Sequence, residues 1–307
     1  MSEGVLWDLC RGATATRVLG IAAELGVSDA LAAGPRPVAE IAAEVGADPR
    51  TLDRYLRALA SDGVFAEDGP GVYRNTEASE LLRRGTPWNA FAQLYGGVWH
   101  RSAGTLDADG AKAFEGEFWD WLADHPRERA LFDLAMEDGT EQRVDRIAGL
   151  AWHDGEAVVD VGGGSGSLLL ALFARLPGMR GVVLDLPETV RDHAALAAAG
   201  IEFVAGSFFE RVPDGDTYVL STVLHNWPDE EAAAILGTIC RDAPTGARVL
   251  ILDWVVDHVE GSAWLDLLGL ALFGAHERTE AQWRALLEAA GLQLDEVGER
   301  LIQATCP

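Results

Sequence analysis

The chain has 307 residues, 49% of them hydrophobic, and its 49 acidic and 24 basic side chains give a formal net charge of −25 at pH 7. So acidic a surface repels phosphate backbones and anionic lipid, which argues against nucleic acid and membranes as partners. No apolar run approaches the ~18 residues of a membrane span, the N-terminus lacks a signal-peptide pattern, and the three cysteines form no CxxC pair, so we expect a cytoplasmic protein without a metal site or disulfide framework.

The first 75 residues predict helices followed by a hairpin. Apolar side chains at helical spacing predict one helix and a short second one within 13–33. Further helices are predicted over 38–45, closed by Gly46, and from Asp48-Pro49, an acceptor cap followed by proline, to Gly63. The apolar runs 64–66 and 72–74 flank a glycine- and proline-containing turn and predict the hairpin. Helix, turn, helix and hairpin in this order are typical of a winged helix.

Many winged helices bind DNA, so DNA binding is the alternative to a packing role. Arg50, Arg54 and Arg57 share one face of the second predicted helix and could meet phosphates. Acidic side chains surround them, and the whole chain is acidic, which favours a protein-packing module. We therefore interpret residues 1–90 as a winged-helix dimerisation domain; a DNA-binding regulator with a ligand-sensing domain is the alternative.

The rest of the chain divides into a helical, aromatic-rich segment and an alternating one. Residues 91–150 predict a helical region that contributes to a substrate pocket or linker. Short β-rich runs then alternate with helical segments: 157–161, 181–184, 202–205, 218–224 and 248–252. This alternation predicts an α/β fold over 151–307, a Rossmann-like, doubly wound parallel sheet.

A glycine-rich turn follows the first of these strands. Glycines at 162, 164 and 166 occupy relative positions 1, 3 and 5, and the sixth position is Ser167, where a dinucleotide fingerprint requires glycine. With Asp160 two residues upstream, this spacing favours S-adenosylmethionine over NAD. Asp185 closes the second strand, where an acid can accept hydrogen bonds from both ribose hydroxyls. A tight turn without a ligand is the alternative.

Five motifs occur in order: the glycine turn 159–166, Leu184-Asp185-Leu186-Pro187, Gly206-Ser207-Phe208-Phe209, Leu224-His225-Asn226-Trp227-Pro228-Asp229-Glu230 and Glu277-Arg278-Thr279. On these motifs nearly the whole chain resembles the class I small-molecule O-methyltransferases with an N-terminal dimerisation domain. That family includes plant caffeate and flavonoid enzymes and bacterial tailoring enzymes of aromatic natural products.

The resemblance implies a homodimer that uses S-adenosylmethionine to methylate a hydroxyl of a small aromatic acceptor. It implies cofactor contacts at Gly162, Gly164, Asp185, Ser207, Phe208 and Ser221, a catalytic base at His225 with the acids Asp253 and Glu277, and acceptor contacts at Phe132, Met136, Trp99, Leu268 and Phe273. Ser207 departs from the family's usual aspartate, and Asp253 is one methylene shorter than the glutamate of plant members.

The residue types suit this chemistry. A phenol with a pKa near ~10 must lose its proton, and a histidine with an ordinary pKa of ~6.5 is a suitable base. His225 and Asp253 each end a predicted strand, so neighbouring strands would bring both to the cofactor end of the sheet. An acid beside the imidazole fixes its tautomer. The alternatives are a solvated Asp253 and a surface pair of Glu277 with Arg278 or Arg284.

Two alternative hypotheses use the same cofactor site differently. Carbon or nitrogen atoms of indoles and amines are possible methyl acceptors. A repurposed member of the family would instead hydroxylate, decarboxylate or cyclise its substrate.

Overall fold

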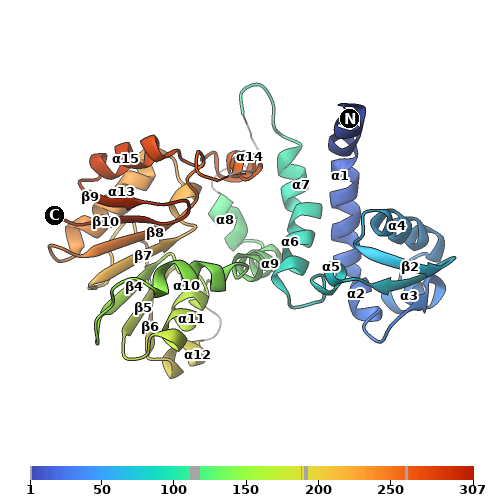
Figure 1. Ribbon diagram of the computed structural model, residues 1–307, viewed down its shortest axis with the longest axis horizontal. Helices are drawn as coiled ribbons and strands as arrows, with labels where there is room; N and C mark the ends of the chain where they lie inside the picture. The colour runs from blue at the N-terminus through green and yellow to red at the C-terminus, as the bar shows by residue number, and fades with distance from the viewer. Residues whose placement is uncertain (1, 111–117, 188, 190–192, 260–261) are drawn as a thin grey trace. The chain divides into compact units, whose positions relative to one another are not determined.

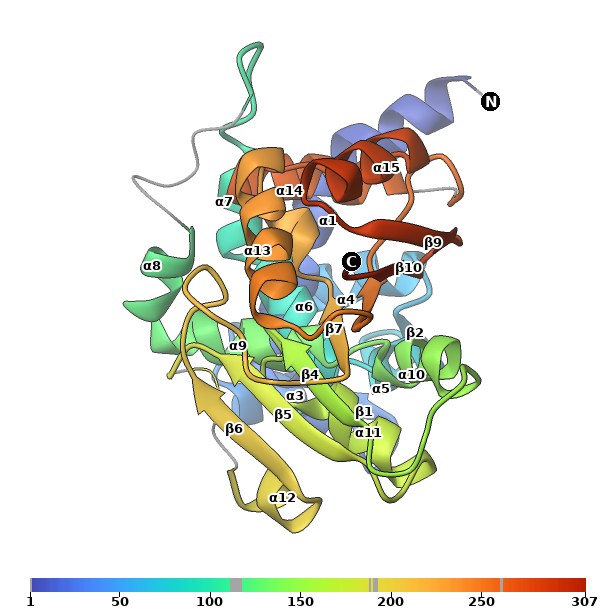
Figure 2. The ribbon, with the colours of Figure 1, turned by 90° about the vertical axis from the view of Figure 1, so that its left-hand side faces the viewer.

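The computed structural model describes residues 2–110, 118–187, 189, 193–259 and 262–307, which form two compact units (Figures 1 and 2). The first unit contains the described residues among 1–106 and 113–138, and the second those among 107–112 and 139–307. The predicted segment 91–150 is therefore divided between the two units. Within the described part of the chain, no helix has both the length and the apolar character needed to cross a membrane.

The first unit begins with the predicted winged helix, which the structure confirms. Its elements are α1 (Ser2–Leu25), α2 (Val27–Ala30), β1 (Arg36–Pro37), α3 (Val38–Val45), α4 (Pro49–Ser61), β2 (Phe65–Gly69) and β3 (Val72–Asn75). The strands pair in the order β1-β3-β2. The predicted cap holds, because the Asp48 carboxylate accepts a hydrogen bond from the Thr51 amide at 2.8 Å. Ile41, Leu52 and Leu56 are buried in the core of this domain.

Helix α1 begins eleven residues before the predicted start at residue 13. Its first three turns carry exposed apolar side chains, among them Leu6, Trp7 and Leu9. Because no polar face alternates with this apolar one, residues 2–12 lack the amphipathic pattern on which the prediction depended.

Five shorter helices complete the first unit: α5 (Glu77–Glu80), α6 (Pro87–Gly96), α7 (Val98–Ala103), α8 (Phe118–Ala123) and α9 (Pro126–Met136). Helix α6 lies between α1 and α9 and contacts both (Figure 1). Gly20 and Gly96 allow the close approach of α1 to α6, because a Cβ atom at Gly20 would lie 2.8 Å from the Gly96 Cα.

The second unit is a seven-stranded sheet covered by helices. Its elements are α10 (Thr140–Ala148), β4 (Ala157–Val161), α11 (Ser167–Arg175), β5 (Arg180–Asp185), α12 (His193–Ala198), β6 (Ile201–Ala205), β7 (Thr217–Ser221), η1 (Leu224–Asn226), α13 (Asp229–Asp242), β8 (Arg248–Leu252), α14 (Ser262–Phe273), α15 (Glu280–Ala289), β9 (Gln293–Val297) and β10 (Ile302–Thr305). Strand order is β6-β5-β4-β7-β8-β10-β9. The five predicted strands are parallel neighbours, as expected.

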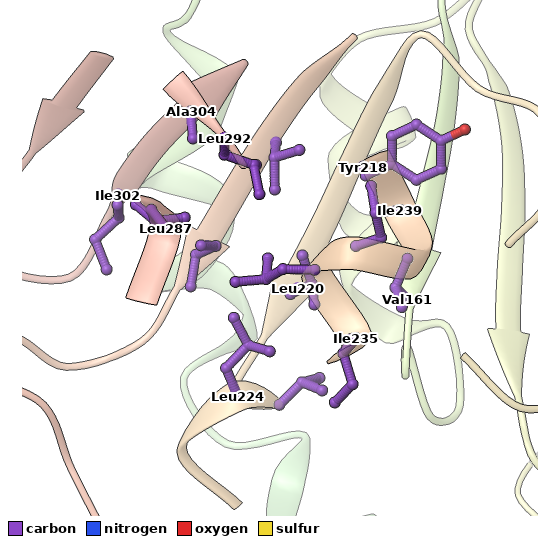
Figure 3. Packing of buried hydrophobic residues seen from close by; sticks show 14 of the residues in the cluster. Val161, Tyr218, Leu220, Leu224, Ile235, Ile239, Leu287, Leu292, Ile302 and Ala304 are labelled. Atoms are coloured by element: carbon purple, nitrogen blue, oxygen red, sulfur yellow. The ribbon is translucent and has the colours of Figure 1, made fainter. Parts of the chain in front are cut away.

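Strands β9 and β10 were not predicted; β10 runs antiparallel to both β8 and β9. Residues 218–220 in β7 and 249–252 in β8 are fully or almost fully buried, as in a sheet covered on both faces. Leu220, Tyr218, Ile235 and Ile239 belong to the core that β7 shares with α13 (Figure 3). Strand order reverses between β4 and β7, so ligands are expected at the carboxyl ends of these strands.

The prediction of a strand over 218–224 is wrong at its C-terminal end. Strand β7 stops at Ser221, and Thr222 has φ 55°, the one positive φ of a non-glycine residue in the described chain. The Thr222 amide still donates to the Leu252 carbonyl at 3.1 Å, after which the chain turns into the 3-10 helix η1. His225 therefore lies in a short helical turn after the strand.

Candidate active site

The glycine turn after β4 has the backbone that its sequence requires. Gly162, Gly164 and Gly166 have φ values of 71°, 59° and 76°, which side chains disfavour. The Gly164 amide donates to Asp185 Oδ2 at 2.8 Å, so this carboxylate at the end of β5 holds the turn. Two predicted cofactor residues from neighbouring strands are thereby brought together.

The Asp185 carboxylate is fixed by further donors. Its Oδ1 accepts from the Leu186 amide at 2.7 Å and from the Thr189 hydroxyl at 2.8 Å. A carboxylate offers about four lone-pair positions, so Asp185 keeps acceptor capacity for a ligand such as a ribose diol.

Asp160 places a buried carboxyl group behind the turn. It is 1% exposed, and neither carboxylate oxygen has a hydrogen-bond partner among the described residues. Burial, with a smaller contribution from Asp185, raises the pKa of Asp160 to about 7, against the opposing charge of Arg143. A Cβ atom at Gly163 would lie 2.5 Å from the Asp160 Cγ, so this turn tolerates only glycine there. An orphaned acid behind a glycine turn fits a cationic ligand such as S-adenosylmethionine.

The remaining predicted cofactor residues lie on neighbouring loops. Phe208 packs edge-on against Trp227, and a Cβ atom at Gly162 would lie 3.4 Å from its ring. Ser207 accepts a hydrogen bond from the Phe209 amide at 3.3 Å, and Ser221 is the half-buried last residue of β7. Phe208 is thus the one of these three that the structure places directly against the glycine turn.

The three predicted acid–base residues come together at the ends of β7 and β8. His225 Nδ1 lies 2.6 Å from Glu277 Oε1, and Asp253, directly after β8, is 1% exposed with no hydrogen-bond partner among the described residues. Both alternatives for the acids are therefore wrong: Asp253 is buried, and Glu277 contacts His225 while Arg284 pairs with Glu280. Because Nδ1 faces a carboxylate, Nε2 is left for another partner.

Electrostatics make this histidine a strong base. Burial by itself lowers the pKa of His225, but the carboxylates of Asp253 and Glu277 outweigh it and raise the pKa to about 9. Burial also raises the pKa of Asp253, to about 6, although the His225 charge opposes this rise. The cluster therefore stabilises an imidazolium, the form that a base reaches after it has taken a proton.

The glycine turn and the histidine turn are adjacent. Strands β4 and β7 pair in parallel, so their carboxyl ends lie side by side. A Cβ atom at Gly162 would lie 3.0 Å from Cγ2 of Val223, two residues before His225. A ligand bound on the glycine turn would therefore lie close to the imidazole.

The predicted acceptor residues belong to different units. Leu268 and Phe273 lie on α14, which packs against the turn η1 that carries His225. In the first unit, Phe132 is buried on α9 and packs edge-on against Trp119, and Met136 ends the same helix. Trp99 is buried on α7, and its indole N–H has no hydrogen-bond partner among the described residues.

Two side chains that support the cluster were missed by sequence reasoning. Arg278 is 0% exposed and donates to the Leu224 carbonyl at 2.8 Å, and Asp266 Oδ1 accepts from the Glu277 amide at 2.7 Å. The only available signal was the position of Arg278 directly after Glu277, and this is equally compatible with a surface ion pair.

Comparison with known proteins identifies the family of the chain. The family model of the O-methyltransferase domain matches residues 102–293, and that of the O-methyltransferase dimerisation domain matches residues 7–85. A phenazine O-methyltransferase, PhzM of Lysobacter antibioticus, is 36% identical over 314 residues, which cover 96% of this chain and 92% of that protein.

Solved structures extend the similarity to the fold. The crystal structure of LaPhzM superposes on this chain with a TM-score of 0.91 at 33% identity, and the alignment covers 100% of each chain. NcsB1, an O-methyltransferase from neocarzinostatin biosynthesis solved with S-adenosyl-L-homocysteine and 1,4-dihydroxy-2-naphthoic acid, has a TM-score of 0.80 at 34% identity and covers 96% of each chain. The chain therefore belongs to the family of S-adenosylmethionine-dependent O-methyltransferases.

Proposed function

We propose that this enzyme methylates a phenolic hydroxyl of a small aromatic natural product, with His225 as the general base. The observation that carries the proposal is the 2.6 Å contact between His225 Nδ1 and the buried Glu277. This contact fixes the ring so that Nε2 is free for the acceptor. The relatives support an aromatic acceptor, since one is named a phenazine O-methyltransferase and NcsB1 was solved in complex with 1,4-dihydroxy-2-naphthoic acid.

The residues at the glycine turn are suited to hold the cofactor. We assign Asp185 to the ribose hydroxyls, Gly162 and Gly164 to the methionine part, and Ser207 and Phe208 to the adenine. Ser221, at the end of β7, is assigned a polar contact. S-Adenosylmethionine supplies an activated methyl group on a positively charged sulfur, so the protein's main tasks are alignment and proton removal.

Proton removal falls to His225. An unperturbed imidazole can take this proton, although its pKa of ~6.5 lies below that of a phenol, near ~10. Asp253 and Glu277 raise the pKa of His225 to about 9, which brings it close to that of the acceptor. The proton then moves to Nε2, and the resulting imidazolium is stabilised by the two carboxylates.

Acceptor binding is assigned to apolar side chains. Leu268 and Phe273 lie on the helix that packs against the His225 turn, which supports their role. Phe132, Met136 and Trp99 receive the same role from the family resemblance. Flat apolar and aromatic surfaces favour a planar ligand.

The test is methyl transfer from methyl-labelled cofactor to dihydroxynaphthoic and hydroxyphenazine acceptors. We expect an O-methyl product, identified by the carbon NMR shift of the labelled methyl. His225→Ala should lower kcat by ~10²–10⁴. Calorimetry should find its affinity for S-adenosyl-L-homocysteine unchanged. A His225→Ala variant with full turnover, or a labelled C-methyl product, would overturn the proposal.

We also propose that the chain is a homodimer. The dimerisation-domain match begins at residue 7, within α1, and this helix exposes Leu6, Trp7 and Leu9, which are 57–68% accessible. A surface this apolar at one helix is typical of an interface. Light scattering should report a dimer for the wild type and a shift toward monomer for Trp7→Glu; a monomeric wild type would contradict the proposal.

A further inference from the structure

We propose that Arg278 is a positioning residue that fixes the turn carrying His225, so that the imidazole keeps its orientation toward the acceptor. The inference rests on the proposed role of His225 as the base. The hydrogen bonds of Arg278 reach neither the imidazole nor the glycine turn.

All three guanidinium nitrogens of Arg278 donate hydrogen bonds to one short segment, residues 224–229. Nη1 donates to the Leu224 carbonyl at 2.8 Å, Nη2 to the Trp227 carbonyl at 2.7 Å, and Nε to Asp229 Oδ1 at 2.8 Å. The two carbonyls belong to the residues immediately before and two after His225. One rigid, planar group thus holds both ends of the turn that presents the base.

The same short segment also supplies the imidazole's partner. Glu277 precedes Arg278 directly and contacts His225 Nδ1. Two consecutive side chains therefore hold the site: the Arg278 guanidinium binds carbonyls of the turn, and the Glu277 carboxylate contacts the imidazole nitrogen. On the other side, Asn226 Nδ2 donates to the Thr222 carbonyl at 3.1 Å and closes the turn upon itself.

Burial makes the environment of Arg278 energetically unfavourable for a charge. The side chain is fully buried, and its ion-pair partner Asp229 has a side chain that is 60% exposed. The Trp283 ring lies 5.2 Å away and adds a cation–π contact. Apolar residues of similar volume are often as stabilising as a buried charge, so stability alone is a poor reason for an arginine here. Its fork of donors to two separated carbonyls is what an apolar residue or a lysine lacks.

Arg278 also acts on the base through its charge. The charged groups near His225 are Asp253 after β8 and Glu277 and Arg278 before α15. Burial lowers the pKa of His225, the two carboxylates raise it, and the guanidinium lowers it. The positioning effect of Arg278 and the effect of its charge on the His225 pKa can therefore be separated by two substitutions. Arg278→Lys keeps the charge, and Arg278→Met removes it.

The experiment compares Arg278→Met and Arg278→Lys in methyl transfer across pH. We expect both variants to lose ~10–100-fold in kcat, because a small misplacement of a catalytic group has effects of that size. The KM for S-adenosylmethionine should stay within about twofold. The acid limb of the kcat profile should move to higher pH in Arg278→Met and remain near the wild-type position in Arg278→Lys.

Asp229→Asn is the matched control, since it removes the surface carboxylate and leaves both carbonyl contacts of Arg278 in place. We expect its kcat to stay within about threefold of wild type. Calorimetry with S-adenosyl-L-homocysteine checks that each variant is folded. If Arg278→Met does not fold, Arg278→Lys carries the test, and an unchanged kcat in that variant would overturn the proposal.

A double-mutant cycle separates this inference from the proposed function. If Arg278 acts through His225, Arg278→Lys should cause no further loss in a His225→Ala background. An equal loss in both backgrounds would refute the positioning role while leaving His225 as the base. A fully active His225→Ala variant would instead refute the proposed function itself.

Discussion

The carboxyl end of the sheet carries two neighbouring sites that are built in different ways. At β4 and β5, backbone amides and glycine conformations form the site, and Asp185 is bound by its own neighbours Leu186 and Thr189. At β7 and β8, buried side chains from distant segments form the site, and the contacting pair His225 and Glu277 is separated by 52 residues. The first site depends largely on local chain geometry, with the bond from the Gly164 amide to Asp185 joining two neighbouring strands. The second depends on the sheet order and on the loop before α15.

This difference predicts how each site fails. A substitution at the glycine turn should weaken ligand binding and leave proton transfer intact. A substitution in the histidine cluster should slow the chemical step and leave cofactor affinity intact. Three experiments test this separation, from the largest expected effect to the smallest.

Glu277→Gln should give the largest effect. The base must be neutral to accept a proton, so activity rises as pH rises through the pKa of His225, which Asp253 and Glu277 raise to about 9. Removing the Glu277 charge lowers this pKa, and the acid limb of the rate profile should therefore move to lower pH. We expect kcat to fall by ~10²–10⁴, the range of general acid–base catalysis, because the imidazole loses its orienting acid. An unchanged profile, measured with labelled cofactor from pH 6 to 10, would contradict the separation.

Stability should depend on pH in two distinct windows. A buried acid whose pKa is raised to about 7, as for Asp160, costs stability as pH rises from its ordinary pKa through that value. For His225, whose pKa is raised to about 9, the contribution is complete below its ordinary pKa and is lost as pH rises through 9.

Asp160→Asn should therefore remove its own share of the loss between about pH 4 and 7, worth ~2–4 kcal/mol, and leave the alkaline window unchanged. Asp253, whose pKa burial raises to about 6, keeps its share of the acidic window. His225→Asn should remove the alkaline loss and leave the Asp160 share of the acidic window unchanged, while the Asp253 share grows because the His225 charge no longer opposes the rise of the Asp253 pKa. Denaturant unfolding of the ligand-free protein at a series of pH values measures both effects. Loss of both windows in one variant would show that the two sites are coupled.

Asp185→Asn should give the smallest of the three effects. Hydrogen bonds to a charged group contribute ~1.5–3 kcal/mol, so cofactor affinity should fall by about 10–100-fold. At saturating cofactor, kcat should stay within about threefold. Asp216→Asn is the matched control, because Asp216 lies at the opposite end of the same sheet, where it accepts from the Ala157 amide at 2.8 Å. Equal losses of affinity in the two variants would point to a general effect on the sheet.

Much of the fold was predictable because its signals are local. The winged helix followed from a capped helix and a glycine turn, and the parallel sheet from alternating strands and helices. The capping box of Thr279 with Gln282 is equally local, since its two residues are three positions apart. In each case residues close in sequence set their own backbone, so the pattern carries the information.

The cofactor turn belongs to the same class. Gly162, Gly164 and Gly166 have positive φ angles, and the choice of glycine at these positions by itself indicates such angles. The motif order that indicated the O-methyltransferase family likewise needed no structure, and the comparisons confirmed it.

Tertiary structure decided what lies across the sequence. It buried Glu277 against His225, where a surface pair with Arg278 or Arg284 was equally consistent with the residues. It brought the sulfur atoms of Cys240 and Cys306 to within 3.3 Å of each other, although no CxxC spacing predicts this contact. Both remain free thiols. The physical reason is that burial and side-chain partners depend on which strands become neighbours, whereas the dihedral angles of a turn or a cap depend on the residues that form it.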